Sequence, residues 1–217
     1  MSSISPKAQP VCLVIIGPSG AGKSTQAKKL YEYLKAEGFP VVLTHEPGGT
    51  DISERIRQIL LDKDNLGMCA LTELFLYFAS RAQHVFEVIK PALKENKIVI
   101  SDRYHDSTMA YQGEGRGVPK VKIKEMNDFA TSGIIPDITF LIDVPPQVAL
   151  KRLEQFDRIE REDIEFHKRV RSEYLQLARE NEKRFVIIDG MADIETIFEQ
   201  IKEKVNDFIV SNGVLNE

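Results

Sequence analysis

Short apolar segments recur along the chain and are separated by longer stretches in which apolar residues follow a helical spacing. The five apolar segments span residues 11–16, 41–44, 98–101, 138–144 and 185–189. Each is apolar almost without interruption, which is typical of strands buried on both faces. Helices are expected over 23–37, 52–61, 71–94, 120–131, 147–155, 163–183 and 194–210. This alternation predicts an α/β fold with a parallel sheet covered by helices on both faces.

The domain organisation follows from the length and from the lack of an internal linker. A chain of 217 residues is long enough for one well-packed core and too short for two full domains. We expect one domain over residues 11–210, a disordered lead-in at 1–10 and a short tail at 211–217. The lead-in does not read as a signal peptide, and the longest apolar runs are too short to cross a bilayer.

The charge and the cysteines restrict the class of partner. The chain has 29 Lys and Arg against 33 Asp and Glu, for a net charge of -4. It therefore has no global basic field that would favour nucleic acid, and an anion site must come from local arginines and backbone amides. Cys12 and Cys69 form neither a disulfide framework nor a zinc pattern. We expect a cytoplasmic protein with no nucleic-acid and no membrane partner.

The turn after the first strand has the pattern of a phosphate-binding loop. Residues 17–24 read GPSGAGKS and match GxxxxGK[ST]. Its glycines allow successive amides to point at phosphate oxygens, at the positive end of the following helix. Lys23 adds a charge toward the terminal phosphates, and the Ser24 hydroxyl can ligate Mg²⁺. The pattern predicts a nucleoside triphosphate, but GTPases, ATPase motors and small-molecule kinases all share it.

Polar residues follow the second and third predicted strands, where a second ligand can bind. Glu46 lies in the turn HEPGGT after the second strand, and Asp102 and Arg103 follow the third. Ligands of parallel α/β sheets bind at this carboxyl edge. An acid there can hold Mg²⁺ or orient a nucleophile, and a guanidinium binds phosphate oxygens in a bidentate manner. A simple turn and a salt-bridged strand end are the structural alternatives.

Three further segments carry weaker signals. Tyr77 and Arg81 are four residues apart and therefore share a helix face, although a core aromatic stripe with a surface arginine explains that segment equally well. Thr108 and Gln112 offer hydrogen bonds to a base edge, and Tyr111 lies between them. Residues 151–161 are densely charged, which indicates either a solvated helix face or a closing lid.

Taken together and in this order, the segments resemble thymidylate kinases. The matching motifs are EPGGT, DRY, YQGEGRG, TSGIIPDITFLIDVPP and DRIERED, and the resemblance covers residues 11–210. It implies a P-loop kinase fold with a five-stranded parallel sheet in the order 2-3-1-4-5 and a mobile lid at about 151–163. It also implies transfer of the ATP γ-phosphoryl group to dTMP, giving dTDP with Mg²⁺, by a cytosolic homodimer packed through helices.

The resemblance further implies individual roles. The catalytic residues would be Lys23, Asp102, Arg103 and the lid residue Arg158. ATP would contact Gly17, Pro18, Ser19, Gly20, Ala21, Gly22, Lys23, Ser24, Thr25 and Arg152, the last of these near adenine. The acceptor dTMP would contact Glu46, Arg57, Tyr77, Arg81, Arg103, Thr108, Tyr111 and Gln112. Ser24 and Asp102 would hold Mg²⁺.

Four positions depart from the pattern that the family usually shows. Relatives read Glu-Gly-x-Asp/Glu where this chain has Ile16, Gly17, Pro18 and Ser19, so both acids are missing. Tyr77 stands in place of a stacking phenylalanine, and His45 in place of an arginine. These departures leave open a kinase for another pyrimidine monophosphate, or a nucleotide-binding regulator without catalysis. A GTPase is disfavoured because no Asn-Lys-x-Asp guanine reader is present.

Overall fold

The five predicted strands form one parallel sheet, and the computed structural model describes it within residues 10–213. The strands are β1 (Val11–Ile16), β2 (Val41–His45), β3 (Ile98–Asp102), β4 (Ile138–Asp143) and β5 (Phe185–Asp189). They lie in the order β2-β3-β1-β4-β5, which confirms the order that the resemblance implied. Most of the expected lead-in, and residues 214–217 of the expected tail, lie outside the described residues.

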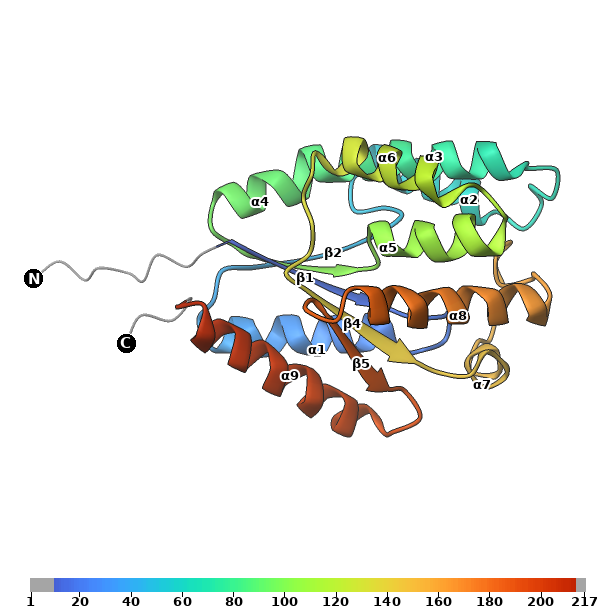
Figure 1. Ribbon diagram of the computed structural model, residues 1–217. Coiled ribbons are helices and arrows are strands. Elements are labelled where there is room, and N and C mark those ends of the chain that lie inside the picture. Colours follow the sequence, from blue (N-terminus) through green and yellow to red (C-terminus); the bar gives the residue numbers. More distant parts are fainter. Residues whose placement is uncertain (1–9, 214–217) are drawn as a thin grey trace, which may run out of the picture.

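Helices cover both faces of the sheet (Figure 1). One face carries α1 (Lys23–Ala36) and α9 (Ile194–Ser211), and α7 (Pro146–Lys151) packs beside them. The other carries η1 (Val85–Ile89), α4 (Lys90–Lys94), η2 (Met109–Gly115) and α8 (Ile164–Glu180). The outer helices on that side are α2 (Asp51–Leu61), α3 (Ala70–His84), α5 (His105–Thr108) and α6 (Lys120–Thr131).

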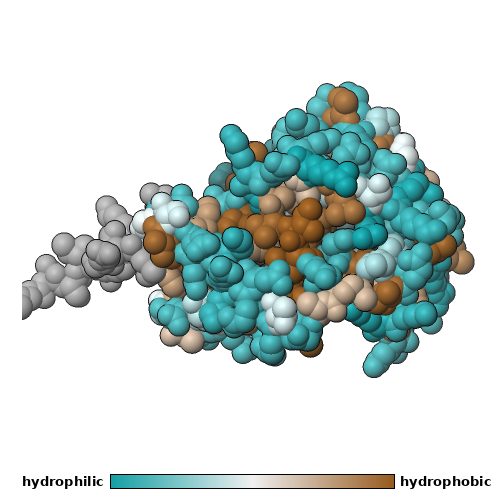
Figure 2. All heavy atoms as spheres, turned by 60° about the horizontal axis from the view of Figure 1, so that its bottom comes forward, coloured by the Kyte–Doolittle hydropathy of each residue, from teal (hydrophilic) through white to brown (hydrophobic). Residues whose placement is uncertain are grey.

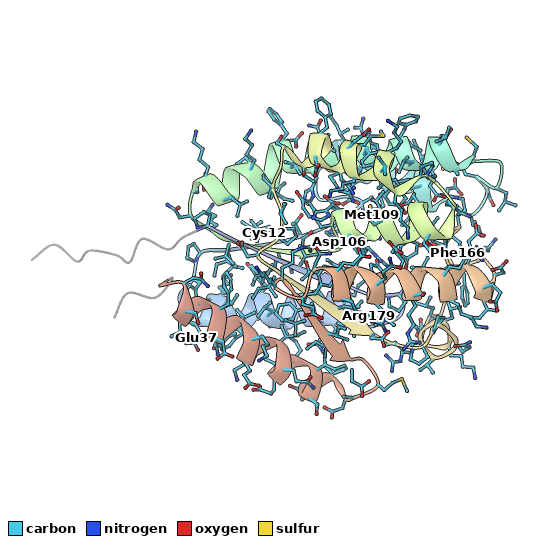
Figure 3. All side chains as sticks on the ribbon, in the orientation of Figure 1. Cys12, Glu37, Asp106, Met109, Phe166 and Arg179 are labelled. Carbon is cyan, nitrogen blue, oxygen red and sulfur yellow. The ribbon has the colours of Figure 1, made fainter. Side chains whose placement is uncertain are left out.

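The central strand β1 shows why its sequence is uniformly apolar. Val11, Leu13 and Ile15 belong to the core under α1 and α9. The alternate residues, such as Cys12, belong to the core under α8, where Phe166 also lies (Figure 3). Because successive side chains point to opposite faces of a strand, a strand with a core on each side has no polar positions.

Two helical segments differ from the sequence expectation. The single helix expected over 71–94 is divided into α3, the π-helical turn η1 and α4. The helix expected over 147–155 ends at Lys151, and its C-cap residue Arg152 begins the irregular segment 152–163. The predicted lid region therefore consists of the end of α7 and this connection.

The helical segment formed by α5 and η2 was not predicted as a helix. Its last three residues read GEG, and glycine disfavours helices in isolation. The segment is held by packing against α8, since a Cβ atom on Gly115 would lie 2.6 Å from the Phe166 ring. This close approach requires glycine and brings the side chains of α5 and η2 to the carboxyl edge of the sheet.

The two edge strands of the sheet are β2 and β5. Ile187 of β5 is half exposed. Figure 2 shows the side on which β5, α9 and α1 lie, where apolar residues gather in a patch surrounded by hydrophilic ones. Within residues 10–213, no helix combines the length and the apolar character that crossing a membrane requires.

Candidate functional site

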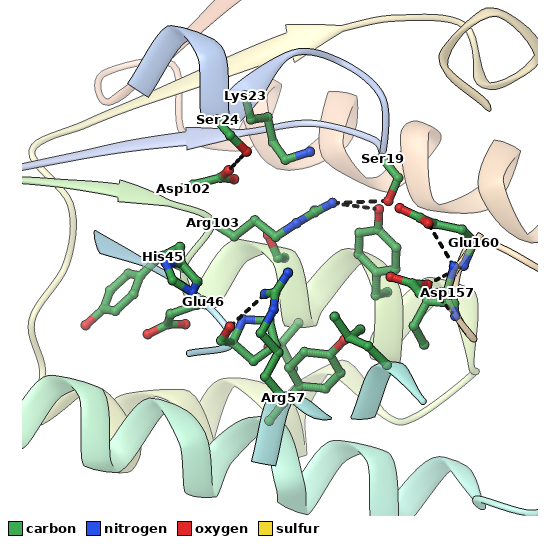
Figure 4. Close-up of a pocket in the computed structure, with 18 of the residues that line it drawn as sticks. Ser19, Lys23, Ser24, His45, Glu46, Arg57, Asp102, Arg103, Asp157 and Glu160 are labelled. Atoms are coloured by element: carbon green, nitrogen blue, oxygen red, sulfur yellow. Dashed lines mark hydrogen bonds between the residues drawn. The ribbon is translucent and has the colours of Figure 1, made fainter. Parts of the chain in front are cut away.

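A cleft of about 520 Å³ opens at the carboxyl ends of β1, β2 and β3. The phosphate-binding loop forms one wall, and residues of α2, α3, α5 and η2 form the other (Figure 4). The predicted site residues that line it are Ser19, Gly20, Lys23, Ser24, Glu46, Arg57, Tyr77, Arg81, Asp102, Arg103, Thr108, Tyr111 and Gln112. Gly17, Pro18, Ala21, Gly22 and Thr25 belong to the same loop and to the start of α1. Arg152 and Arg158 do not line the cleft.

The phosphate-binding loop is compressed against α7. Gly20 has φ +79°, and a Cβ atom there would collide with the carbonyl oxygen of Ala149. The loop ends at Gly22, which caps the N-terminus of α1 in a left-handed conformation. The loop amides and the positive end of the helix dipole are thereby brought together, and such an arrangement binds phosphate groups.

Lys23 crosses the loop rather than pointing to solvent. Its Nζ donates to the carbonyl oxygen of Pro18 at 2.8 Å. Burial lowers the pKa of Lys23 to about 7, with a further lowering by Arg103 that Asp102 partly offsets. A bound polyphosphate would favour the charged form of this ammonium group, because an opposite charge nearby opposes the effect of burial.

Ser24 and Asp102 meet at the floor of the cleft. The Ser24 hydroxyl donates to Oδ2 of Asp102 at 2.5 Å. The other carboxylate oxygen, Oδ1, is sealed from solvent and has no hydrogen-bond partner within the described residues. Both are hard oxygen ligands of the kind Mg²⁺ prefers. No group of three His, Cys, Asp or Glu that could hold a metal occurs in residues 10–213.

Arg103 bridges the two walls of the cleft. Its Nη1 donates to the Gly17 carbonyl oxygen at 3.1 Å and to the Tyr174 hydroxyl at 3.2 Å. Its Nη2 makes only long contacts, 3.4 Å to the Tyr111 hydroxyl and 3.5 Å to Ser19 Oγ (Figure 4). The backbone of Arg103 has φ +71°, a strained conformation for a non-glycine residue that is common at functional sites.

Arg81 is the centre of a buried polar network on the opposite wall. Its Nε donates to Glu46 Oε2 at 2.8 Å, and its Nη1 donates to Thr108 Oγ1 and to Asn127 Oδ1. His84 contacts the second oxygen of Glu46 at 3.1 Å. Burial alone would raise the pKa of Glu46, but Arg81 and His84 outweigh it and hold that pKa below its ordinary value. Arg81 is therefore a donor whose orientation is fixed by three acceptors.

Two further predicted residues lie between the network and the loop. Arg57 of α2 donates from Nη1 to the Pro47 carbonyl oxygen at 2.7 Å. Tyr77 is half-buried in the same cleft, and burial raises the pKa of its hydroxyl, so the ring stays neutral. Arg57 can thus contact an anion, and Tyr77 can stack on a base.

The predicted lid arginine Arg158 faces away from the cleft. The Asp157 carboxylate accepts the amides of Ile159 and Glu160 at 2.8 and 2.9 Å. This turn places Asp157 and Glu160 on the cleft. Arg158 lies on the opposite side, where Nε donates to the Leu60 carbonyl oxygen at 2.8 Å.

The guanidinium of Arg152 is also outside the cleft. Its Nη2 donates to the Gly190 carbonyl oxygen at 3.2 Å, which joins the end of α7 to the turn after β5. This position borders the phosphate-binding loop through α7, since Gly20 contacts Ala149.

Several site residues were missed by the sequence analysis. Glu73 and His84 lie four residues before Tyr77 and three after Arg81, so helical spacing already placed them on the same face. Asn127 of α6 and Tyr174 of α8 come from distant elements and carry no local signal. All four make hydrogen bonds to predicted site residues.

Comparisons with known proteins show which family the chain resembles. The family model for thymidylate kinase matches residues 15–201. The chain belongs to the thymidylate kinase family. The thymidylate kinase of Fervidobacterium nodosum is 49% identical over 195 residues, covering 89% of this chain and 97% of that relative. That of Caldanaerobacter subterraneus subsp. tengcongensis is 45% identical, covering 89% and 93%. The crystal structure of thymidylate kinase from Ehrlichia chaffeensis has a TM-score of 0.75 at 35% identity and covers 90% of this chain and 98% of that one.

Proposed function

We propose that this protein transfers the γ-phosphoryl group of ATP to dTMP and releases dTDP and ADP. The observation that carries this proposal is that the phosphate-binding loop and residues of α2, α3, α5 and η2 line the same cleft, with Arg103 between them. A GTPase or an ATPase motor needs no such second wall. Family membership identifies the second ligand of the proposal as a thymidine nucleotide.

The cradle would hold ATP through the loop amides and Lys23. Ser24 and Asp102 fit a Mg²⁺ ion, which would neutralise charge on the transferred phosphoryl group. We assign Arg57 and the loosely held Nη2 of Arg103 to the acceptor phosphate. Catalysis of this reaction is mainly positioning and charge neutralisation, because an acceptor phosphate oxygen is itself the nucleophile. It forms a bond to the γ-phosphorus while the bond to the β–γ bridging oxygen breaks.

The base of dTMP would lie between Tyr77 and the buried network. Tyr77 and Tyr111 supply aromatic surface, and Arg81 supplies a donor for the base edge. Thr108 already accepts a hydrogen bond from Arg81, so its part is to fix that guanidinium. We assign Arg152 to contacts with the adenine of bound ATP, because it caps α7, the helix that packs against the phosphate-binding loop.

Arg158 is assigned to the closed state of the lid. Reaching the γ-phosphoryl group requires its bonds to Leu60 and Glu73 to break. ATP would supply the anion that replaces Glu73, and closure would exclude water.

The assay that tests the proposal is ADP release from ATP with Mg²⁺, with dTMP, dUMP, UMP, CMP, dCMP, AMP and GMP offered one at a time. A strong preference for dTMP supports it. Preference for another pyrimidine nucleotide would attribute specificity to Ser19 and Tyr77, which depart from the family pattern. ATP binding without turnover of any acceptor would favour a regulator.

We also propose a homodimer packed through helices, in the cytoplasm. Large apolar side chains are exposed on neighbouring helices α3 and α6, among them Phe75 at 57% and Phe129 at 90%. Such side chains are usual at interfaces between subunits. The two cysteines are free, as expected in a reducing compartment. Light scattering should give twice the mass of the chain, and a monomeric mass would contradict the dimer.

A further inference from the structure

Glu73 is a buried carboxylate that touches the nucleotide cleft only through another residue. It lies on α3, one turn before Tyr77, and is 1% exposed. Its Oε1 accepts from Gln112 Nε2 at 2.8 Å and from Arg116 Nε at 3.1 Å. Its Oε2 accepts from Arg116 Nη2 at 3.0 Å and faces Arg158 Nη1 at 2.7 Å. All four contacts come from nitrogen donors, so both oxygens are fully used.

This arrangement fixes which end of the Gln112 amide faces the cleft. A carboxylate paired with two arginines is ionised, and an ionised carboxylate can only accept hydrogen bonds. Gln112 must therefore turn its NH₂ group toward Glu73 and its oxygen away. Gln112 lines the cleft, and within residues 10–213 its Oε1 neither accepts a hydrogen bond nor counts among the sealed polar atoms. Gln112 is 1% exposed, and we place this unpaired oxygen on the side of the residue that lines the cleft.

Arg81 lies on the same wall and offers a hydrogen-bond donor where Gln112 offers an acceptor. Its Nε and Nη1 are committed to Glu46, Thr108 and Asn127. Its Nη2 has no partner within the described residues and is not sealed. The wall thus offers a base one donor, from Arg81, and one acceptor, from Gln112.

Pyrimidines differ in how they match such a pair. Thymine and uracil present a carbonyl oxygen beside an N3–H donor. Cytosine presents an amino donor beside an unprotonated N3 acceptor, which is the inverse pattern. A site built to hydrogen-bond one pattern discriminates against the other because its own polar groups are left unpaired.

We propose that Glu73 is a positioning residue for base specificity: it holds the Gln112 amide with its oxygen toward the cleft, so that the site accepts the imide edge of thymine and rejects cytosine. The proposal rests on the proposed function, since it requires the acceptor to be a pyrimidine nucleotide in this cleft. The carboxylate itself contacts no substrate.

The test is the ratio of kcat/KM for dTMP to that for dCMP in Glu73→Gln. The new amide can donate as well as accept, so Gln112 is no longer held in one orientation. We expect the ratio to fall about tenfold, the size of one hydrogen-bond preference. The ratio of dTMP to dUMP should stay within about twofold, because these bases share the same edge. A merely structural role would lower all three rates in parallel and leave both ratios unchanged.

A double-mutant cycle separates action through Gln112 from other effects. In a Gln112→Met background, Glu73→Gln should change the dTMP to dCMP ratio no further. Glu162→Gln is the matched control, because Glu162 is the other carboxylate on Arg116 and does not touch Gln112. It should leave the ratio at the wild-type value. The same tenfold fall in the Gln112→Met background, or in Glu162→Gln, would overturn the proposal.

A second variant guards against loss of folding in Glu73→Gln. Glu73→Asp keeps the charge near Arg116 and Arg158 and withdraws it from Gln112 by one methylene, so it should lower the same ratio. An unchanged ratio in both folded variants would refute the role of Glu73 while leaving the proposed function intact. Failure of the wild type to prefer dTMP over dCMP would instead refute the assignment of the acceptor.

Discussion

Replacing Arg103 by lysine keeps the positive charge but removes the second arm of the guanidinium. In the structure, Nη1 is held by Gly17 and Tyr174, and the weakly bound Nη2 is the arm left for the acceptor phosphate. A lysine has one nitrogen and cannot hold both positions. The variant therefore loses one charge-assisted hydrogen bond in the transition state, worth about 1.5–3 kcal/mol.

That loss corresponds to a fall in kcat of about 10- to 150-fold, since each 1.4 kcal/mol is a factor of ten. The assay is steady-state ADP release with saturating ATP and dTMP, together with the thermal midpoint of each protein. Arg171→Lys is the matched control, because Arg171 makes a bidentate pair with Asp143 at 2.7 Å outside the cleft. It should keep the wild-type kcat. A kcat for Arg103→Lys within twofold of wild type would refute the assignment of the second arm to catalysis.

Three further predictions follow from the same geometry. Gly20→Ala should weaken ATP binding about 5- to 150-fold, because the Cβ collision with Ala149 and the positive φ cost about 1–3 kcal/mol. Calorimetry measures this affinity, and an unchanged value would contradict the close packing of the loop against α7. Arg158→Ala should lower kcat by about 10³ or more if the lid delivers this arginine, and a nearly full kcat would exclude that role. The urea midpoint should fall as the pH is lowered from about 5 to below about 4. The reason is that Glu46, Glu73 and Asp106 have lowered pKa values in the folded state. The stability that these carboxylates contribute is complete above their pKa in the unfolded chain and is lost as the pH falls through their pKa in the folded protein. A constant midpoint down to pH 3 would contradict this prediction.

The sheet and the phosphate-binding loop could be predicted because their signals are local. Strands with a core on both faces are continuous in apolar residues, as β1 is. The loop needs glycines and a lysine at fixed spacing, and the structure places it between β1 and α1. The prediction of the strand order, by contrast, rested on the resemblance to a family and not on the pattern of apolar positions.

The second wall of the cleft could be predicted only in part. Tyr77 and Arg81 share a helix face by spacing, but nothing local shows that Arg81 is buried against Glu46 and Asn127. The helix formed by α5 and η2 depends on packing against Phe166, which no local propensity records. Arg158 was expected to act in the lid, but no local pattern indicates that Glu73 and Leu60 hold its side chain away from the cleft.

The measurement that tests the account most directly follows a labelled γ-phosphoryl group from ATP in the presence of Mg²⁺ and dTMP. If the cleft holds both nucleotides in line and excludes water, the label should appear in dTDP, with inorganic phosphate no higher than in the enzyme-free control. Label that appears only in inorganic phosphate would show that water, and not an acceptor held by Arg57 and Arg103, is the nucleophile. Label that remains in ATP would contradict catalysis in this cleft.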